Sequence, residues 1–381
     1  MPLAIAYFLS ALCGSMTSVA VSVHFATDGQ TAWVVSATLI SGALVQVFGG
    51  PVLAPLFDKR SPRTLAISAA LVEALLLGLL AAWPHPLALI AGTMLSAALS
   101  SISVPALLLL ADASSTSSCT AQAFARMDTA RLIGGFAGPF LGGLLVQVAS
   151  LRAALGLELA ASLILAGIVA ACGARTAPQE RAAGASFLSR IAEAPRLLFR
   201  NPQARGALSS VWTAIIFTST FNVALVFFAI DVLHAGGLGY AALTQAFVLG
   251  RIVGARAAGR VRDTGAHQTV LLTGLSMGAA IAVAGALPHL GLAIACFAAA
   301  GVCNAVQVAA LRFVVMGAVP EEAAPKALSA MGSVNSSAML VGYVVGSPIV
   351  AAVGPAAALV VAGVGTLMVN ALGLASRAAR N

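Results

Sequence analysis

Charged side chains are scarce in this sequence of 381 residues: Asp, Glu, Lys and Arg account for only 8% of it, and hydrophobic residues for 60%. A soluble domain carries about 25% charged residues, which cover its surface. The shortage therefore excludes a water-soluble globular protein. Side chains that face lipid need no such cover, so we interpret the chain as an integral membrane protein.

The sequence also lacks the motifs of metal sites, disulfide frameworks and nucleotide-driven enzymes. It has no CxxC pair, no GxxxxGK[ST] phosphate loop and no HExxH. We therefore expect no enzymatic activity, no metal and no cofactor, and we keep a membrane-embedded enzyme or sensory scaffold as a remote alternative. The five cysteines are expected to be small buried residues: Cys13, Cys119, Cys172, Cys296 and Cys303.

Basic residues outnumber acidic ones, with a formal net charge of +8, yet they do not form the single patch with interleaved aromatics that is typical of nucleic-acid binding. They lie in short loops between apolar runs. Because cytoplasmic loops accumulate Lys and Arg, we assign the loop at 56–63 and the linker at 173–206 to the cytoplasm, which leaves only Arg152 opposite. This predicts a multi-pass protein of the cell (inner) membrane, with both termini cytoplasmic, and no nucleic-acid partner.

Gly, Pro and charge separate the apolar runs into segments of about the 20 residues that a transmembrane helix needs. The predicted fold class is therefore all-α, with 12 transmembrane helices. The first span lacks the cleavage site of a secretory signal and is expected to stay in the membrane. The expected spans are 3–24, 33–55, 64–83, 87–110, 128–149, 151–172, 207–229, 238–258, 268–287, 290–316, 326–349 and 354–376.

The one long polar stretch lies in the middle of the chain, at 173–206. Its segment SFLSRIAEAPRLLFR places apolar residues at helical spacing against charged ones, which favours an amphipathic helix on the inner membrane surface. A solvated connector is the alternative. We divide the chain into an N-terminal six-helix bundle at 1–172, this cytoplasmic linker, and a C-terminal six-helix bundle at 207–381.

Two features of the first half recur in the second half. Asp263 follows the eighth span as Asp58 follows the second, 205 residues earlier. The segment GGFAGPFLGG at 134–143 has a weaker counterpart, GYVVGSPIVA, at 342–351, an offset of 208. Similar offsets from independent features indicate two related six-helix halves.

Together these features resemble the major facilitator superfamily. The resemblance covers essentially the whole chain: 12 helices in two halves, an Asp-basic loop after the second span, its copy after the eighth, and a long central linker. It implies two pseudo-symmetric six-helix bundles that carry a small-molecule substrate by alternating access. We expect the protein to be a monomer.

The family's loop pattern is Gly-x-x-x-Asp-Arg/Lys-x-Gly-Arg-Arg/Lys, from which this sequence departs at Ala54, Ser61 and Pro62. The resemblance implies that the loop carboxylate is held against neighbouring helix ends in one state and released in the other, so that it acts as a conformational latch. Simple positive-inside anchoring is the alternative. The residues assigned to this latch are Asp58, Lys59, Arg63, Gly259 and Asp263.

The segment GFAGPFLGG in the fifth span is similar to the family's second signature, Gly-x-x-x-Gly-Pro-x-x-Gly-Gly, which is associated with exporters that run as antiporters. Glycines at this spacing let helix backbones approach closely, and a Pro bends the helix. A packing motif without a transport role is the alternative. The expected upstream Gly is Ala125, and the matching residues are Gly134, Gly138, Pro139, Gly142 and Gly143.

The longer segment RMDTARLIGGFAGPFLGGLLV resembles the branch that contains the enterobactin exporter and the macrolide efflux proteins. In that branch an Arg commonly stands at the position of Arg131. The resemblance implies efflux of a molecule of drug or siderophore type.

An ionised side chain at mid-bilayer costs roughly 2.5 to 3.5 kcal/mol, so each one needs an explanation. Glu73 lies nine residues into the third predicted span, about 14 Å deep and near the centre of a ~30 Å core. A carboxyl group there could exchange a proton as the cavity opens to water; a neutral Glu that holds helices together is an equal alternative. The proton-coupling candidates are Glu73, Glu158, Asp128 and Arg131.

In this superfamily the substrate lies between the halves, lined by helices 1, 2, 4, 5, 7, 8, 10 and 11. The polar residues of those spans are mostly neutral and have aromatic neighbours, which predicts an amphipathic cavity. A buried Ser or Asn can equally hold helices together. The cavity candidates are Ser15, Thr17, Gln46, Phe221, Asn222, Gln245, Asn304, Gln307 and Asn335.

The sequence therefore predicts a secondary active transporter: a proton-coupled exporter of a small amphipathic organic molecule. An importer or uniporter of a small solute on the same fold is the alternative.

Overall fold

The structure is a computed structural model of the chain, and every regular element among its described residues is a helix, as the predicted fold class requires. The described residues are 2–29, 32–53, 56–57, 60–113, 120–171, 202–258, 265–317, 319 and 324–378.

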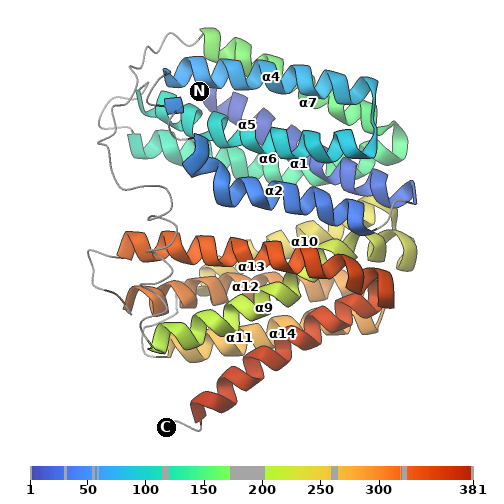
Figure 1. The fold of residues 1–381 in the computed structure, drawn as a ribbon, viewed down its shortest axis with the longest axis vertical. Coiled ribbons are helices and arrows are strands. Elements are labelled where there is room, and N and C mark those ends of the chain that lie inside the picture. Colours follow the sequence, from blue (N-terminus) through green and yellow to red (C-terminus); the bar gives the residue numbers. More distant parts are fainter. Residues whose placement is uncertain are drawn as a thin grey trace. The chain divides into compact units, whose positions relative to one another are not determined.

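Within those ranges the chain forms long helices joined by short connections (Figure 1). The helices are α1 (Pro2–Thr27), α2 (Ala32–Leu53), α4 (Pro62–Ala82), α5 (Pro86–Ala113), α6 (Thr120–Val148), α7 (Leu151–Ala171), α9 (Pro202–Phe227), the π-helix η1 (Phe228–Val232), α10 (Gly236–Ala258), α11 (Ala266–Ala286), α12 (Leu290–Gly317), α13 (Ala324–Val353) and α14 (Pro355–Ala378).

The predicted spans match these helices closely, except that α6 begins eight residues before its predicted start at 128. Its first turns, TAQAFARMDT, are too polar for a bilayer, and the apolar part of α6 is Thr129–Val148. A helix satisfies its own backbone hydrogen bonds, so it continues past the apolar stretch. The hydrophobicity pattern therefore locates the membrane segment and not the end of the helix.

Proline starts five of the helices: Pro2, Pro62, Pro86, Pro202 and Pro355. The first helical position suits proline, because its missing N–H would have no partner there and its φ angle is already helical. At α4 the preceding Ser61 adds a cap, since its side-chain oxygen accepts a hydrogen bond from the Thr64 amide at 3.3 Å.

Eleven of the described helices are long and apolar enough to cross a membrane. The remaining one, α2, contains a shorter apolar stretch, Ala32–Val45. Large apolar side chains are exposed along the outer faces, for example Leu75 and Leu79 on α4 and Leu157 on α7. Such faces need lipid around them, so the chain is a multi-pass membrane protein.

The chain divides into two compact units with matching helix contacts. In unit 1, α1 packs on α6 and α7, and α4 packs on α5 and α7. In unit 2, α9 packs on α13 and α14, and α11 packs on α12 and α14. Unit 1 comprises residues 1–30, 37–183 and 236–241, and unit 2 comprises residues 31–36, 184–235 and 242–381.

A constant offset of 204 residues relates the two sets of helices. It separates the first residues of α2 and α10, α4 and α11, α5 and α12, α6 and α13, and α7 and α14. The helix ends repeat too: the Trp83 amide donates to the Leu79 carbonyl as the Leu287 amide donates to that of Val283. The two six-helix halves predicted from the sequence therefore share one helix arrangement.

The offset of 208 that the glycine segments suggested is one helical turn too long. At 204 residues, Gly138 on α6 corresponds to Gly342 on α13, and both meet a carbonyl of the neighbouring helix, that of Leu12 and that of Ile216. Glycines four residues apart repeat every turn. A pattern of this kind matches itself at two registers, and the structure selects the shorter one.

Candidate functional site

The glycine motif of α6 lies directly against α1. A Cβ atom at Gly134 would come within 2.6 Å of the Phe8 carbonyl oxygen. At Gly138 it would collide with Ser15 Oγ and the Leu12 carbonyl oxygen, and at Gly142 with the Met16 carbonyl oxygen. Consecutive turns of α6 thus need glycine for the two backbones to touch.

The other two motif residues lie on the same helix. Pro139 stands inside α6 and is buried. Gly143 faces the backbone of Gly237, a residue of α10 that belongs to the same unit. All five motif residues therefore lie on a closely packed segment of α6.

One serine and one threonine that were predicted for the cavity lie inside helix contacts of unit 1. Ser15 donates its hydroxyl to the Ala11 carbonyl at 2.6 Å and also lies against Gly134, so it packs α1 on α6. Thr17 is 8% exposed and faces Glu158 of α7. Neither residue lines the cavity described below.

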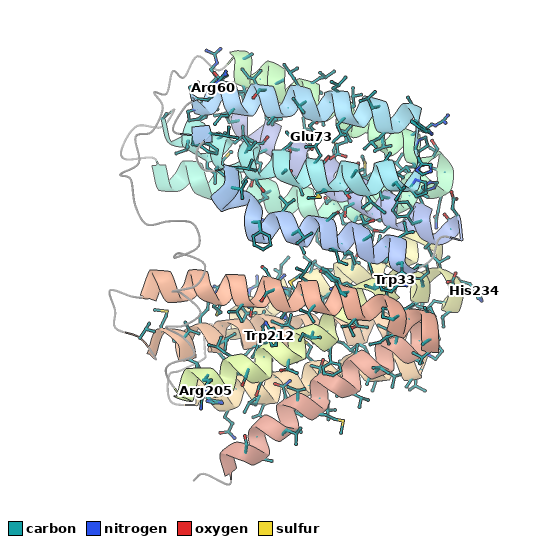
Figure 2. The ribbon with its side chains drawn as sticks, in the orientation of Figure 1. Trp33, Arg60, Glu73, Arg205, Trp212 and His234 are labelled. Atoms are coloured by element: carbon teal, nitrogen blue, oxygen red, sulfur yellow. The ribbon has the colours of Figure 1, made fainter. Side chains whose placement is uncertain are left out.

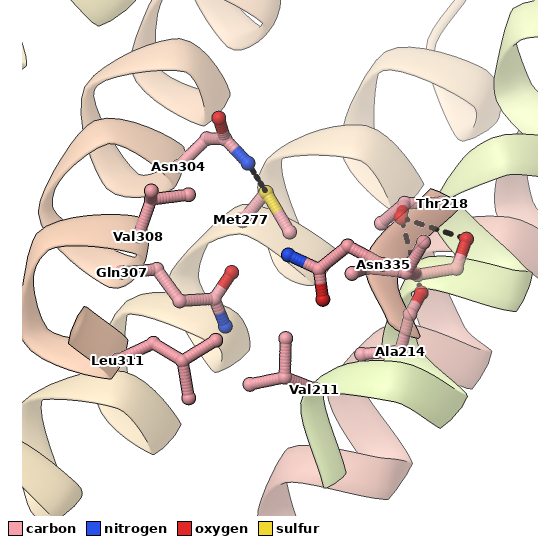
Figure 3. Close-up of a pocket in the computed structure, with 10 residues that line it drawn as sticks. Val211, Ala214, Thr218, Met277, Asn304, Gln307, Val308, Leu311 and Asn335 are labelled. Atoms are coloured by element: carbon pink, nitrogen blue, oxygen red, sulfur yellow. Dashed lines mark hydrogen bonds between the residues drawn. The ribbon is translucent and has the colours of Figure 1, made fainter. Parts of the chain in front are cut away.

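Unit 2 contains a partly enclosed cavity of about 40 Å³ between α9, α11, α12 and α13 (Figure 3). Three of the predicted cavity residues line it, and all three are amides: Asn304, Gln307 and Asn335. Its other lining residues are Val211, Ala214, Ile215, Thr218, Met277, Val308 and Leu311. A volume of this size holds one or a few water molecules.

The amide groups of this cavity, called the amide cavity below, are only partly used by the protein. Gln307 Nε2 donates to the Val270 carbonyl at 3.1 Å, which leaves its Oε1 as an acceptor. Asn304 Nδ2 lies 4.0 Å from Met277 Sδ, a weak contact. The Asn335 side chain points into the space between them (Figure 3). The cavity therefore presents both donors and acceptors among apolar walls.

Met277 and Thr218 were missed by the sequence reasoning. Met277 lies on α11, the ninth span, which was not among the helices expected to line a passage. Thr218 was overlooked because hydroxyls are common in membrane helices, and its own bonds go to the Ala214 and Ile215 carbonyls. No sequence signal points to them, because neither residue shares a helix with any of the three amides.

The remaining cavity candidates lie elsewhere. Phe221 packs on the rings of Phe247 and Phe297, at centroid distances of 5.9 and 5.6 Å. Gln245 is 2% exposed, and its Oε1 has no hydrogen-bond partner. Asn222 is half-buried on α9. The side chain of Gln46 lies outside the described residues.

Glu73 and Glu158 lie at one helix junction, although no sequence pattern indicates that they are neighbours. Glu73 is on α4 (Figure 2) and Glu158 on α7, two helices that pack on each other. They are 9% and 8% exposed and interact electrostatically. The carboxyl group of Glu158 also lies beside Gly14 of α1.

Of the predicted latch, only Arg63 lies within the described residues; Asp58, Lys59, Gly259 and Asp263 fall outside them. Arg63 Nη2 donates to the Ala170 carbonyl, in the last turn of α7. A guanidinium group there satisfies a free carbonyl and suits the negative end of the helix dipole. The contact joins the start of α4 to the end of α7.

The other two proton-coupling candidates, Asp128 and Arg131, lie on α6, where the side chain of Asp128 is outside the described residues. The side chain of Arg131 is exposed. At the 204-residue offset Arg131 corresponds to Asn335, which lines the amide cavity of unit 2.

The model of the Major Facilitator Superfamily matches residues 3–264, more than two thirds of the sequence. The chain belongs to the Major Facilitator Superfamily. The resemblance on which the fold was predicted is thereby confirmed at the level of the superfamily, and the chain is a transporter and not an enzyme. No curated protein matches the sequence significantly.

Solved transporters of this superfamily share the fold over nearly the whole chain. A variant of the nucleoside transporter NupG superposes with a TM-score of 0.78 at 15% identity, covering 98% of each chain. The peptide transporter POT in complex with sulfate gives 0.72 at 13% identity, covering 98% of this chain and 93% of that one. A bacterial homologue of the human lysosomal transporter Spinster gives 0.68 at 14% identity, covering 99% and 96%.

Proposed function

We propose that this superfamily member is a proton-coupled exporter of a small amphipathic organic molecule of drug or siderophore type. It alternates between states open to either side of the cell (inner) membrane, acts as a monomer, and has both termini in the cytoplasm. The finer resemblance to the enterobactin and macrolide efflux branch belongs to this proposal.

The observation that carries the proposal is the contact between the α6 motif and α1. Gly134, Gly138 and Gly142 each face a backbone atom of α1. The motif associated with exporters therefore packs against α1 at three successive turns of α6. A transport helix fixed in this way moves as one body with its neighbour. These three glycines of the motif stand at the contact on successive turns of α6.

The amide cavity supports the choice of substrate. Asn304, Gln307 and Asn335 offer neutral donors and acceptors next to Met277 and Val308. Such a surface favours a molecule that is largely apolar and carries a few hydrogen-bonding groups, and gives no strong site for a fully charged solute. The space itself is small, so we assign these amides to one part of a larger molecule.

Transport into everted membrane vesicles tests this proposal. A panel of fluorescent drugs and ferric siderophores is offered to vesicles that contain the protein, with an imposed proton gradient. Accumulation that disappears on addition of a protonophore is expected. Uptake that persists without any ion gradient would overturn the coupling, and transport of no amphipathic compound would overturn the substrate class. Vesicles that lack the protein give the background uptake.

An importer or uniporter of a polar solute is the second candidate. It is favoured by the similarity to a nucleoside transporter and to a peptide transporter, since amides can pair with the donors and acceptors of such solutes. Counterflow of radiolabelled uridine or a dipeptide in proteoliposomes separates the two. Counterflow of these solutes, with none of the amphipathic panel, would replace the exporter with this candidate.

A further inference from the structure

Glu73 and Glu158 lie at the same depth of unit 1. Glu73 stands nine residues before the end of α4 at Ala82, and Glu158 stands seven residues after the start of α7 at Leu151. At 1.5 Å per residue these positions are about 13 and 10 Å from neighbouring helix ends. Because α4 and α7 pack closely, the two carboxyl groups lie near enough to interact electrostatically.

The carboxyl group of Glu158 is held against α1. A Cβ at Gly14 would be 3.5 Å from Glu158 Oε1, so the absent side chain leaves room for the carboxyl group. Thr17, 8% exposed, turns its hydroxyl toward Glu158 without completing a regular hydrogen bond, and this Oγ1 has no other partner. Cys13 is the other titratable group that faces the pair from α1.

Within the described residues no cation neutralises this pair. The other charged residues of the two helices are Arg63, which binds the Ala170 carbonyl, and Arg152, six residues from Glu158 and exposed. Two carboxylates buried together without a cation repel each other and lose their hydration. At least one of them must therefore carry a proton, and the two titrate as one coupled system.

The fold itself does not require these carboxyl groups. At the 204-residue offset, unit 2 has Met277 in place of Glu73 and Ala362 in place of Glu158. The matching contacts of Gly138 with Leu12 and of Gly342 with Ile216 extend this offset to α1 and α9, where Phe221 stands in place of Thr17. All three are apolar, and α9, α11 and α14 pack there as closely as their counterparts do. A buried acid that one repeat has and the other lacks has a role other than packing.

We propose that Glu73, Glu158 and the Thr17 hydroxyl form a single proton-exchange site in which the two carboxyl groups share one proton. In the one-proton state the O–H of one carboxyl group donates to the carboxylate of the other. Loading transfers a second proton from hydronium to that carboxylate, which releases a water molecule and leaves two neutral carboxyl groups. Release to water reverses the step.

The site deepens the proposed function, on which its transport role rests, because it names the coupling ion and its position. A hard metal cation fits less well, since such an ion takes six or more oxygen ligands. Here two carboxyl groups and one hydroxyl face one another, and the surrounding helix carbonyls are used within the helices. The described residues contain no group of three or more His, Cys, Asp or Glu that could hold a metal.

Carbodiimide labelling tests the site without any transported substrate, so its outcome is independent of whether the proposed export is observed. The O–H of a protonated carboxyl group in an apolar setting adds across a C=N bond of dicyclohexylcarbodiimide to give an O-acylisourea, and an acyl shift from O to N then gives a stable N-acylurea. The full-length protein in nanodiscs is treated at neutral pH in potassium buffer, and the labelled peptides are quantified by mass spectrometry.

Wild-type protein is expected to incorporate one label per chain, divided between Glu73 and Glu158. In Glu73→Gln the remaining carboxyl group loses a negative neighbour and gains an amide, so the ratio of protonated to ionised Glu158 should fall about tenfold for a coupling of one pK unit, and its labelling should fall with it. Thr17→Val should raise it, because a donor to the ionised form is lost. Asp28→Asn, at an exposed position, should change nothing.

Labelling of Glu158 that is unchanged in Glu73→Gln would overturn the shared proton and make the residues two independent neutral acids. Protection of the wild-type protein by sodium, but not by potassium, would replace the proton with a metal cation. Glu73→Asn, which also replaces the carboxyl group with an amide, provides a second variant if Glu73→Gln fails to fold, with the same expected loss of Glu158 labelling.

Discussion

The two units of this transporter have one helix arrangement and different chemistry inside it. In unit 1 the junction of α1, α4 and α7 holds Glu73, Glu158 and Thr17, where unit 2 has apolar residues. At the amide cavity, two amide side chains of unit 2 stand where unit 1 has smaller hydroxyl side chains. Asn304 and Gln307 correspond to Ser100 and Ser103 of unit 1.

The comparison separates what the fold needs from what the function needs. Features present in both units, such as the contact of α6 with α1 and of α13 with α9, maintain the bundles. Features present in only one unit are free of that requirement. We infer that ionisable groups are concentrated in unit 1 and hydrogen-bonding groups for substrate in unit 2, and the predictions below test this division.

The largest effect is expected where the two units agree. Gly138→Leu puts a side chain into the Leu12 carbonyl, and Gly342→Leu does the same against that of Ile216. Overpacking usually costs about 1 to 3 kcal/mol, and here the obstacle is backbone, so both variants should lose the folded protein in fluorescence-detected size-exclusion chromatography. Gly135→Leu, with nothing within 4 Å of its Cβ, is the matched control. Equal behaviour of Gly138→Leu and Gly135→Leu would contradict the contact.

The next effect comes from moving a carboxyl group from one unit to the other. Ala362→Glu places an acid at a fully buried site of unit 2 that lacks a counterpart of Thr17. It should lower stability by at least about 3 kcal/mol. Glu73→Met introduces the residue of unit 2 and should change stability by less than about 1.5 kcal/mol, since buried charge is often replaced by apolar residues at no loss. Thermal unfolding in detergent measures both, and the opposite order of stabilities would break the comparison.

A smaller effect separates Gln307 from its counterpart Ser103. Gln307→Leu removes a buried hydrogen bond to the Val270 carbonyl and should lower the free energy of unfolding by about 1 kcal/mol. It should also weaken substrate binding. Ser103→Ala removes a buried hydroxyl that has no partner, so it should be neutral or slightly stabilising. Thermal unfolding and transport KM distinguish them, and a larger loss in Ser103→Ala would show that the polar site lies in unit 1.

The smallest effect is expected at Arg63. Its contact with the Ala170 carbonyl is exposed, and charges at helix ends contribute about 0.3 to 1 kcal/mol. Arg63→Gln should therefore lower the unfolding temperature only slightly, and Arg63→Lys should retain most of the effect. A decrease in unfolding temperature as large as that of Ala362→Glu would mean that Arg63 makes stabilising contacts beyond the one at the end of α7.

The sequence was sufficient for the fold because the signals are local. Apolar runs, prolines at helix starts and the recurring glycines define the helices and the repeat. Contacts between side chains of different helices have no such local signal. Glu73 and Glu158 stand 85 residues apart, and nothing in the pattern of either helix shows that they meet. The rotation of each helix, which decides whether Thr17 faces a cavity or an acid, depends on packing of the whole unit.

The cavity candidates were predicted from residue type alone, and the structure places them in different surroundings. Asn304, Gln307 and Asn335 line one cavity, because large amides are rarely tolerated against lipid. Ser15 lies in a helix contact instead, since a small hydroxyl can bond to its own helix and fit anywhere.

The division of roles between the units is tested most directly by proteoliposomes that contain either Glu158→Gln or Gln307→Leu and a substrate identified in the vesicle assay. Glu158→Gln is predicted to keep counterflow, which needs no proton movement, and to lose accumulation driven by a proton gradient, while Gln307→Leu weakens both. Accumulation by Glu158→Gln at the wild-type level would contradict the account.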